Sequence, residues 1–380
     1  MLYLDNNATT KVDENVLTAA LPFLTKDFGN ASSTHRFGLA ANEAVKKARK
    51  QVANLLACEP NEIIFTSGAT EAINLAIKGL SLSDRKHIIT LQTEHTAVLD
   101  TCAYMESIGY EVDYLPVQAS GLVDLEVVKS SIRPDTLLVA IMLANNEIGT
   151  IQPVKAIADL AHAQGAYLFT DATQAVGKLP INLQDLGADL LAFSGHKLHA
   201  PKGIGGLYVR AQRKADGRNF ALTPLQHGGG HEKGLRSGTL NVFGIVALGA
   251  ACEIAGREMQ ANTAKISAMR DFLESELLKI ENTFVNGNRE NRLPNTTNIC
   301  FEGVDSEAII LGLEDIAVSN GSACTAMKIE PSHVLKALGL TDEQAFQSIR
   351  LSLSKYNTMP EIQTAVEKIG KLVKELREML

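Results

Sequence analysis

Thr136-Leu-Leu-Val-Ala-Ile-Met142 and Ala166-Tyr-Leu-Phe-Thr170 are two β-rich segments, separated by a helix-period segment at residues 154–164. Both β-rich segments are almost continuously hydrophobic, as expected of strands that are covered on both faces of a sheet. A strand, a helix and a second strand joined by short connections form a βαβ unit, in which the two strands run parallel. This stretch of sequence therefore predicts a parallel sheet with helices packed on it.

The same alternation extends from about residue 60 to residue 210. A helical segment at 71–78, for example, follows the first of the further strands. The fold class expected from this alternation of strands and helices is α/β, with a mostly parallel central sheet flanked by helices. The further strands are expected at residues 62–66, 87–91, 190–193 and 206–209.

The pattern changes in the last third of the chain. Residues 211–240 are rich in glycine and polar groups, which predicts a long loop or an insertion between elements. A helical run follows at about 242–280, and short strands expected at 298–301 and 317–318 indicate a smaller α+β unit. From Pro360 onwards, apolar residues recur on one face of a helix, which we expect to pack against the body of the protein.

Length and composition limit the class of protein. The chain has 380 residues, which is room for two domains, and 45% hydrophobic with 21% charged residues excludes intrinsic disorder. Aromatic residues make up 5% and Trp is absent, which argues against a stacking platform for single-stranded nucleic acid. The net charge of −7 argues against a broad polyanion-binding face, so direct nucleic-acid binding is not expected.

The cysteines and the apolar stretches predict the compartment. No CxxC pair and no metal-ligand spacing occurs, which predicts reduced thiols in a cytosolic chain. Residues 1–6 lack a basic region followed by an apolar one, so no signal peptide is expected. The longest apolar stretch, residues 242–252, is far short of the roughly 20 residues of a membrane span. We therefore expect a cytoplasmic protein without a membrane segment. The cysteines are Cys58, Cys102, Cys252, Cys300 and Cys324.

Polar residues follow several of the predicted strands, at the edge where open parallel sheets bind ligands. Thr66-Ser-Gly-Ala-Thr70 lies between a strand and a helix, whose free N–H groups would hold a phosphate together with the hydroxyls of Ser67 and Thr70. Ser and Thr are equally common as helix caps, so this segment alone indicates phosphate binding only weakly.

Asp171, His95 and Lys197 follow three other strands. The Asp171 carboxylate could bind a ligand or cap the next turn, and a lone histidine is more often structural than catalytic. Desolvation behind a buried strand would lower the pKa of Lys197 toward that of a usable amine, although lysines usually reach solvent. Together, a phosphate cup, a carboxylate, a stacking histidine and a lysine on neighbouring strand ends match the needs of pyridoxal 5′-phosphate.

A series of motifs runs through essentially the whole chain. It consists of Tyr3-Leu-Asp-Asn-Asn-Ala-Thr-Thr10, Phe65-Thr-Ser-Gly-Ala-Thr-Glu71, Thr93-Glu-His95, Asn145-Asn-Glu-Ile-Gly149, Asp171-Ala-Thr-Gln174, Ser194-Gly-His-Lys197, His227-Gly-Gly-Gly-His231, Arg236-Ser-Gly-Thr239 and Gly321-Ser-Ala-Cys-Thr325. With these motifs the chain resembles the fold-type I pyridoxal-phosphate enzymes of the class V aminotransferase group, and among them the cysteine desulfurases. The resemblance implies a large cofactor-binding domain at residues 15–255. It also implies a small domain at 1–14 and 256–380 that carries the catalytic cysteine.

The resemblance implies a role for individual residues around the cofactor. Lys197 is implied to form the Schiff base, His95 to cover the ring and to assist catalysis, and Asp171 to pair with the ring nitrogen. Arg350, together with Asn146, is implied to bind the substrate carboxylate, for which a planar guanidinium is well suited. The other residues implied to bind the cofactor are Ala69, Thr70, Asn146, Gln174, Ser194 and His196, with Thr239 reaching the phosphate of the neighbouring subunit of a homodimer.

Cys324 lies in a stretch of small residues that predicts an exposed loop, as a reactive thiol requires. From the residues alone this cysteine is only exposed. The resemblance implies that it is the nucleophile of a cysteine desulfurase, a sulfurtransferase that converts L-cysteine to L-alanine and leaves a persulfide on Cys324. No intrinsic metal is expected, although Cys324 could transiently ligate an iron–sulfur cluster.

The resemblance also implies a sulfur-acceptor protein, such as an iron–sulfur scaffold. Transfer RNA thiolation and DNA phosphorothioation start from the same kind of persulfide, so the sequence leaves the pathway open. A selenocysteine lyase or a class V aminotransferase is the nearest alternative, and Cys324 argues against the aminotransferase. A metallohydrolase is a remote alternative because carboxylates are not arranged around its histidines. Those histidines are His196, His199, His227 and His231.

Overall fold

The computed structural model describes residues 1–80, 83–211, 221–321 and 330–379. Its centre is a seven-stranded sheet with the strand order β2-β8-β7-β6-β5-β3-β4. Every pair between β7 and β4 is parallel, and β8 runs antiparallel to both of its neighbours. The predicted mostly parallel sheet is therefore confirmed. Its strands are β2 (Ile63–Thr66), β3 (His87–Leu91), β4 (Glu111–Leu115), β5 (Thr136–Ala140), β6 (Tyr167–Asp171), β7 (Leu190–Ser194) and β8 (Gly205–Val209).

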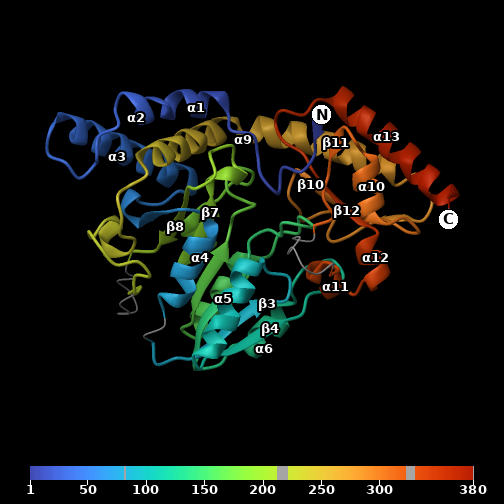
Figure 1. The fold of residues 1–380 in the computed structure, drawn as a ribbon. Helices are drawn as coiled ribbons and strands as arrows, with labels where there is room; N and C mark the ends of the chain where they lie inside the picture. The colour runs from blue at the N-terminus through green and yellow to red at the C-terminus, as the bar shows by residue number, and fades with distance from the viewer. Residues whose placement is uncertain (81–82, 212–220, 322–329, 380) are drawn as a thin grey trace.

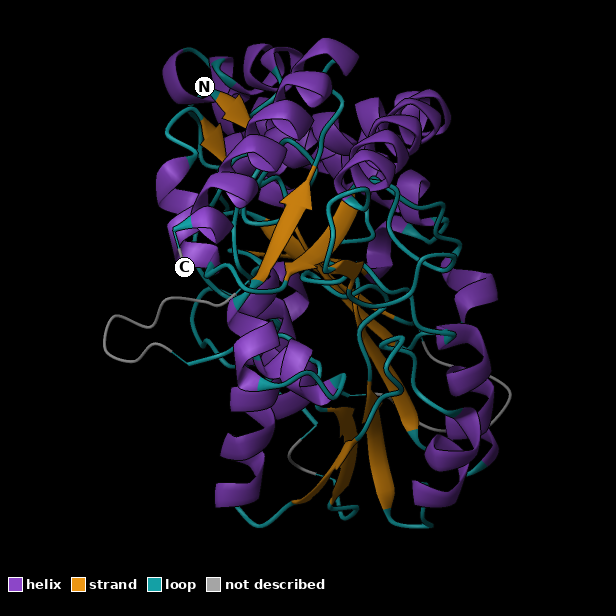
Figure 2. Cartoon of the chain, turned by 90° about the vertical axis from the view of Figure 1, so that its right-hand side faces the viewer, coloured by secondary structure: helices purple, strands orange, loops and turns teal. Residues whose placement is uncertain are grey.

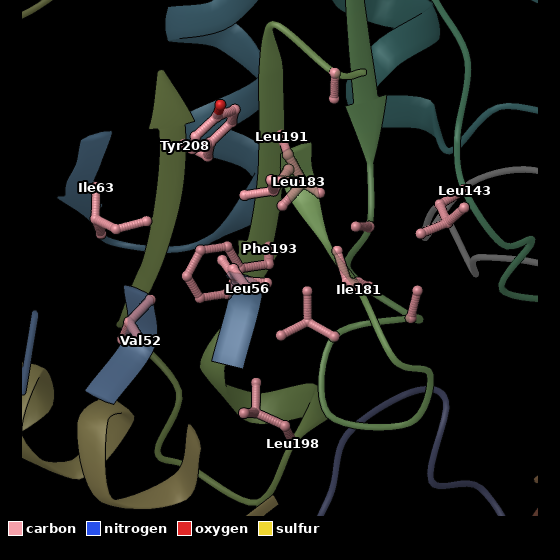
Figure 3. Close-up of a cluster of buried hydrophobic side chains, with 14 of the residues drawn as sticks. Val52, Leu56, Ile63, Leu143, Ile181, Leu183, Leu191, Phe193, Leu198 and Tyr208 are labelled. Carbon is pink, nitrogen blue, oxygen red and sulfur yellow. The ribbon is translucent and has the colours of Figure 1, made fainter. Parts of the chain in front are cut away.

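Helices cover both faces of this sheet (Figures 1 and 2). Side chains alternate between the two faces, so Leu191 and Phe193 belong to one buried cluster while Leu190 and Ala192 belong to the other. Figure 3 shows Phe193 beside Leu56, on the side of the sheet that α3 covers. This two-sided burial is the reason that the strands are hydrophobic throughout. The covering helices are α3 (Arg36–Leu56), α4 (Ala69–Lys78), α5 (Thr96–Ser107), α6 (Leu125–Ser131), α7 (Val154–Ala163) and α9 (Val242–Leu277).

A second core lies at the other end of α9. It is built on a three-stranded antiparallel sheet and includes Leu4 from one end of the chain and Val373 from the other. Figure 1 shows both ends of the chain in this part of the molecule. The strands are β9 (Thr283–Val285), β10 (Thr296–Phe301) and β12 (Ser348–Ser352), with the pair β1 (Leu2–Tyr3) and β11 (Ile316–Ala317) beside them, and the helices are α10 (Ser306–Gly312) and α13 (Met359–Glu378).

Some strands carry no clear sequence signal. The strand β4 is an edge strand with mostly half-exposed residues, so it lacks the continuous hydrophobicity of its neighbours. In β12 the sequence Ser-Ile-Arg-Leu-Ser alternates polar and apolar residues, yet every one of them is buried. Its polar side chains are buried because they contact other polar groups across the molecule.

The remaining elements are short. In the described part of 211–240, the only helix is the turn Glu232–Gly234. Among the described residues, no helix is both long and apolar enough to cross a membrane. The short helices are α1 (Glu14–Ala20), α2 (Pro22–Thr25), α8 (Leu183–Leu186), α11 (His333–Ala337) and α12 (Asp342–Phe346), with the 3-10 turns Pro60–Glu62 and Gly195–Lys197.

Candidate active site

A cavity of about 660 Å³ lies at the carboxyl ends of β2, β6 and β7. Its size is that of an ordinary small-molecule site, and its position is where parallel sheets bind ligands. It brings together almost all of the side chains expected from the sequence. These are Ala69, Thr70, His95, Asn146, Asp171, Gln174, Ser194, His196, Lys197 and Arg350.

Two expected site residues are missing from the described part of the cavity lining. Thr239 is exposed on the described surface of this chain. Cys324 lies outside the described residues. Two positions that precede it in the sequence, Ser319 and Gly321, line the cavity.

Lys197 is placed by the short turn that follows β7. Its Nζ donates hydrogen bonds to the carbonyl oxygens of Asn7, at 2.6 Å, and Ala8, at 2.7 Å. Burial, reinforced by the positive charge of Arg350, lowers the pKa of Lys197 to about 8. Near neutral pH this lysine is therefore far closer to its reactive, uncharged form than an ordinary surface lysine.

Asp171 and His95 lie at the ends of β6 and β3. Asp171 is 5% exposed, and one carboxylate oxygen accepts the N–H of Thr173 at 2.8 Å. His95 caps α5, and its Nδ1 accepts the N–H of Ala97 at 3.0 Å. The neutral ring therefore carries its proton on Nε2. Burial lowers the pKa of His95, which favours this neutral form near pH 7.

The first turn of α4 forms one end of the cavity. The N–H groups at its start have no acceptor within the helix, and Gly68 at the N-cap has no side chain to supply one. A Cβ on Gly205 would lie 2.7 Å from the Cα of Gly68, so only glycine allows β8 to approach this turn so closely. Glu71 holds the turn in place, because its carboxylate accepts the N–H of Ser67 at 2.7 Å and the Nε of Arg236 at 2.9 Å.

Arg350 enters the cavity from β12. Its Nη2 donates to Asp5 at 2.6 Å and its Nη1 to the carbonyl oxygen of Asn146 at 3.2 Å. The Nε of Arg350, Oδ1 of Asn146 and Oγ1 of Thr173 are buried without a hydrogen-bond partner in the described structure. Buried polar atoms are costly when unpaired, so these cavity-lining residues are suited to a polar ligand.

These features fit pyridoxal 5′-phosphate. A lysine with a lowered pKa is available for its aldehyde, a buried carboxylate for its ring nitrogen and a helix N-terminus for its phosphate. His196 lines the same cavity, and burial lowers its pKa to about 4, so it is neutral near pH 7 and can donate or accept a hydrogen bond.

Sequence reasoning missed the part played by Asn7. Its carbonyl oxygen accepts from both Lys197 and Gln174, and its side-chain Nδ2 donates to the carbonyl oxygen of Asn146 at 3.1 Å. The motif at residues 3–10 was visible in the sequence, but carbonyl contacts leave no signature in residue type. Asp5, from the same segment, was likewise given no role.

The histidines of the metallohydrolase alternative have separate partners. His196 contacts Thr9, His199 contacts the carbonyl oxygen of Lys11, and His231 contacts Ser32. Among the described residues, no three His, Cys, Asp or Glu side chains are grouped so that they could hold a metal ion.

Comparison with known proteins places these observations in a family. Residues 2–364 match the family model of the class-V aminotransferases. The cysteine desulfurase IscS of Haemophilus influenzae (strain PittGG) is 50% identical, over 100% of this chain and 94% of its own length. A solved NifS-like protein superposes with a TM-score of 0.91 at 38% identity, covering 98% of this chain and 99% of that one. A structure of SspA in complex with cysteine superposes with a TM-score of 0.83 at 39% identity, covering 94% of this chain and 100% of that one.

Proposed function

The chain belongs to the class-V aminotransferase family, and from this premise we propose that it is a cysteine desulfurase that removes sulfur from L-cysteine with pyridoxal 5′-phosphate. The observation that carries the proposal is the single cavity in which Lys197, Asp171 and Arg350 meet. A reactive amine, an acid and a carboxylate-binding cation are the groups that such an amino-acid reaction needs.

We propose that the cofactor is held by the residues expected from the sequence. Bound there, pyridoxal 5′-phosphate supplies an electron sink for the α-carbon of an amino acid. The first turn of α4, with Thr70, Ser194 and His196, would hold the phosphate. Asp171 would keep the ring nitrogen protonated, and Gln174 would contact the ring oxygen. The cofactor ring would pack against the imidazole of His95, which lines the cavity.

Lys197 and His95 would move the protons. The neutral amine of Lys197 can accept a proton at Nζ from the substrate α-carbon, which its lowered pKa permits near pH 8. His95 carries a proton on Nε2 in its neutral form and can deliver it to the product. The two side chains line the same cavity.

Arg350 would bind the substrate carboxylate. Its Nη2 donates to Asp5 and its Nη1 to the carbonyl oxygen of Asn146, while its Nε has no partner in the described structure. A substrate carboxylate would supply that missing acceptor. This fixed position would direct the rest of the amino acid toward Lys197.

We infer that Cys324 receives the sulfur as a persulfide and passes it to an acceptor protein, such as an iron–sulfur scaffold in the cytoplasm. The position of Ser319 and Gly321 on the cavity wall supports a role for the residues that follow them. The thiolate of Cys324 would attack the substrate sulfur to form the S–S bond, and the carbon–sulfur bond would break with its electron pair going to the β-carbon. A proton delivered to the β-carbon by His95 and return of the α-proton by Lys197 would then give L-alanine.

We also propose that the enzyme is a homodimer. Apolar side chains are exposed on α1 to α3, among them Leu24 (57% exposed), Phe28 (68%) and Phe37 (52%). Ser32 contacts His231 at 3.0 Å, which places the segment carrying Thr239 beside this surface (Figure 1). An exposed apolar surface is typical of an interface, and a second copy on it would place Thr239 near the phosphate of the partner subunit.

The test of the function is the variant Cys324→Ala. We expect it to bind the cofactor with the wild-type absorption spectrum and to lose the formation of alanine and sulfide from L-cysteine. Cys58→Ala, at a half-buried cysteine far along the chain, is the control and should retain activity. A Cys324→Ala enzyme as active as wild type would refute the proposed role. Assays with selenocysteine and with keto-acid acceptors separate the lyase and aminotransferase alternatives.

A further inference from the structure

The proposed reaction does not use Lys178. This lysine is hydrogen-bonded to a residue that lines the cofactor cavity. Its Nζ donates to Oε1 of Gln174 at 2.8 Å. Gln174 lines the large cavity, whereas Lys178 lines a smaller one of about 60 Å³ that Lys197 also borders. In the part of the chain that the structure describes, Gln174 is the only hydrogen-bond partner of this amine.

The two ends of the Gln174 amide have different partners. Oε1 accepts from Lys178, and Nε2 donates to the carbonyl oxygen of Asn7 at 3.0 Å. A carbonyl oxygen can only accept, and the lysine here donates, so only one of the two amide orientations satisfies both contacts. In that orientation, the second N–H of Nε2 is left for a ligand in the cavity.

The backbone around Lys178 brings its side chain back to the residue four positions earlier. Gly177 has a φ of +82°, and a Cβ on it would lie 3.0 Å from the Cβ of Leu198, so another residue would be strained there. The N–H of Lys178 donates to the carbonyl oxygen of Ala175 at 2.9 Å, and Oγ1 of Thr263 on α9 donates to the Lys178 carbonyl oxygen at 3.3 Å. The position of the lysine is therefore fixed from both sides.

The contact does not depend on the charge of the lysine. Burial, together with the positive charges of Lys197 and Arg350, lowers the pKa of Lys178 to about 7. An uncharged amine still has N–H donors, so the hydrogen bond to Gln174 persists on both sides of this pKa. Three other charged residues that line the small cavity form ion pairs with one another. Lys355 pairs with Asp13 at 2.6 Å and with Glu258 at 3.1 Å.

We propose that Lys178 is a positioning residue that holds the Gln174 amide with an N–H directed at the ring oxygen of the bound cofactor. The proposal rests on the proposed function only in requiring that the cavity bind pyridoxal 5′-phosphate. Lys178 itself touches neither cofactor nor substrate, and acts through Gln174.

The test is a double-mutant cycle on the cofactor-bound protein without cysteine. Lys178→Met removes the donor and keeps the apolar stem. We expect it to weaken cofactor binding about three- to tenfold, which corresponds to one hydrogen bond, and to shift the visible absorption band. In a Gln174→Ala background the same substitution should change the cofactor Kd less than about twofold and leave the band in place, because the two residues act as one unit.

The matched control is Thr263→Val, which removes a hydrogen bond to the Lys178 backbone but leaves its amine in place. It should retain the wild-type band. Thermal unfolding of each apoprotein checks the fold, and Lys178→Leu, which also has no donor, replaces the Met variant if that variant does not fold. Equal effects in both backgrounds, or an unchanged band and Kd in the wild-type background, would overturn the proposal. Lack of desulfurase activity in the wild type would refute the function and leave this result standing.

Discussion

The chemistry of the cavity depends on how its two basic groups, Lys197 and Arg350, influence each other. Arg350 lowers the pKa of Lys197, while Asp5 and Asp171 act in the opposite direction. Asp5 pairs with the buried Arg350 guanidinium at 2.6 Å, so this arginine has a carboxylate counter-ion. Lys197 has carbonyl oxygens as partners, which do not neutralise it, and burial therefore favours its uncharged form.

Cofactor loading of the apoprotein should follow this pKa. Because the uncharged amine reacts with an aldehyde, the loading rate should rise about tenfold per pH unit below pH 8 and level off above it. Arg350→Gln removes a charge that lowers the pKa, so its profile should move to higher pH. Stopped-flow absorbance measures the rate, and Arg133→Gln, in a surface ion pair with Glu111, is the control. A profile that does not change with pH between 6 and 9 would contradict the assignment.

At the scale of elements, the second half of α9 is joined to β10 by a buried ionic cluster. Glu274 on α9 is 2% exposed and accepts from Arg292 and, at 2.7 Å, from Thr297 of β10. Burial alone would raise the pKa of Glu274, but the hydrogen bonds and the charge of Arg292 outweigh it and lower the pKa. Since Arg292 is also buried, each group of the pair depends on the other.

Glu274→Gln should destabilise the protein by about 3 kcal/mol at pH 7, because it removes the nearer counter-ion of a buried guanidinium and leaves only Asp271, which is 3.6 Å away and exposed. The folded-state pKa of Glu274 is lowered, so its stabilising contribution is full above the unfolded pKa of about 4.3 and is lost as the pH falls through the folded value. Urea unfolding at pH 7 and below pH 4 measures this. The difference between the variant and the wild type should shrink at the lower pH.

Glu276→Gln is the matched control on the same helix. Glu276 pairs with Lys279 at the surface, where ion pairs contribute little, so the variant should change the unfolding free energy by less than about 0.5 kcal/mol. Equal losses for Glu274→Gln and Glu276→Gln would show that the buried cluster does not carry this stability.

At the scale of the whole molecule, hydrogen bonds between distant parts of the chain join the N-terminal segment to the second core beside the cavity. Asn7 bonds Thr296 at 2.9 Å and Asn295 at 3.0 Å, and its backbone N–H donates to Ser352 at 2.9 Å. These contacts hold the N-terminal segment, which supplies the carbonyl partners of Lys197, against β10 and β12. The two cores thus meet through hydrogen bonds at the cavity.

The proposed homodimer predicts an effect of Phe28→Asp. A charge on this exposed apolar surface should convert the dimer to a monomer and weaken cofactor binding about tenfold, because Thr239 of the second copy no longer reaches the phosphate. Light scattering after gel filtration gives the mass, and absorbance gives the cofactor Kd. Leu311→Asp, at a residue 78% exposed on α10, should leave both unchanged. A Phe28→Asp protein that remains dimeric with normal cofactor affinity would contradict the interface.

Much of the site was predictable because its residues belong to short local motifs at strand ends. Asp171, His95 and Lys197 each follow a hydrophobic strand, and parallel strands bring their ends to one edge, so their convergence in one cavity follows from the fold class. The strands of the central sheet were predictable for the same reason, since burial on both faces requires hydrophobic residues. The edge strand β4 and the polar strand β12 were not, because their partners rather than their composition define them.

The sequence by itself determined the fold class, because this depends on the hydrophobic pattern of the strands, and its motifs determined the family, from which the cofactor and the candidate site residues are inferred. Only the tertiary structure decided which groups share contacts across the chain. The carbonyl oxygens of Asn7 and Ala8 on Lys197, the Asp5 carboxylate on Arg350 and the Lys178 amine on Gln174 all join segments or turns whose approach no local pattern encodes. Backbone carbonyls are the same in every residue, so their role becomes visible only when folding brings a particular donor to them.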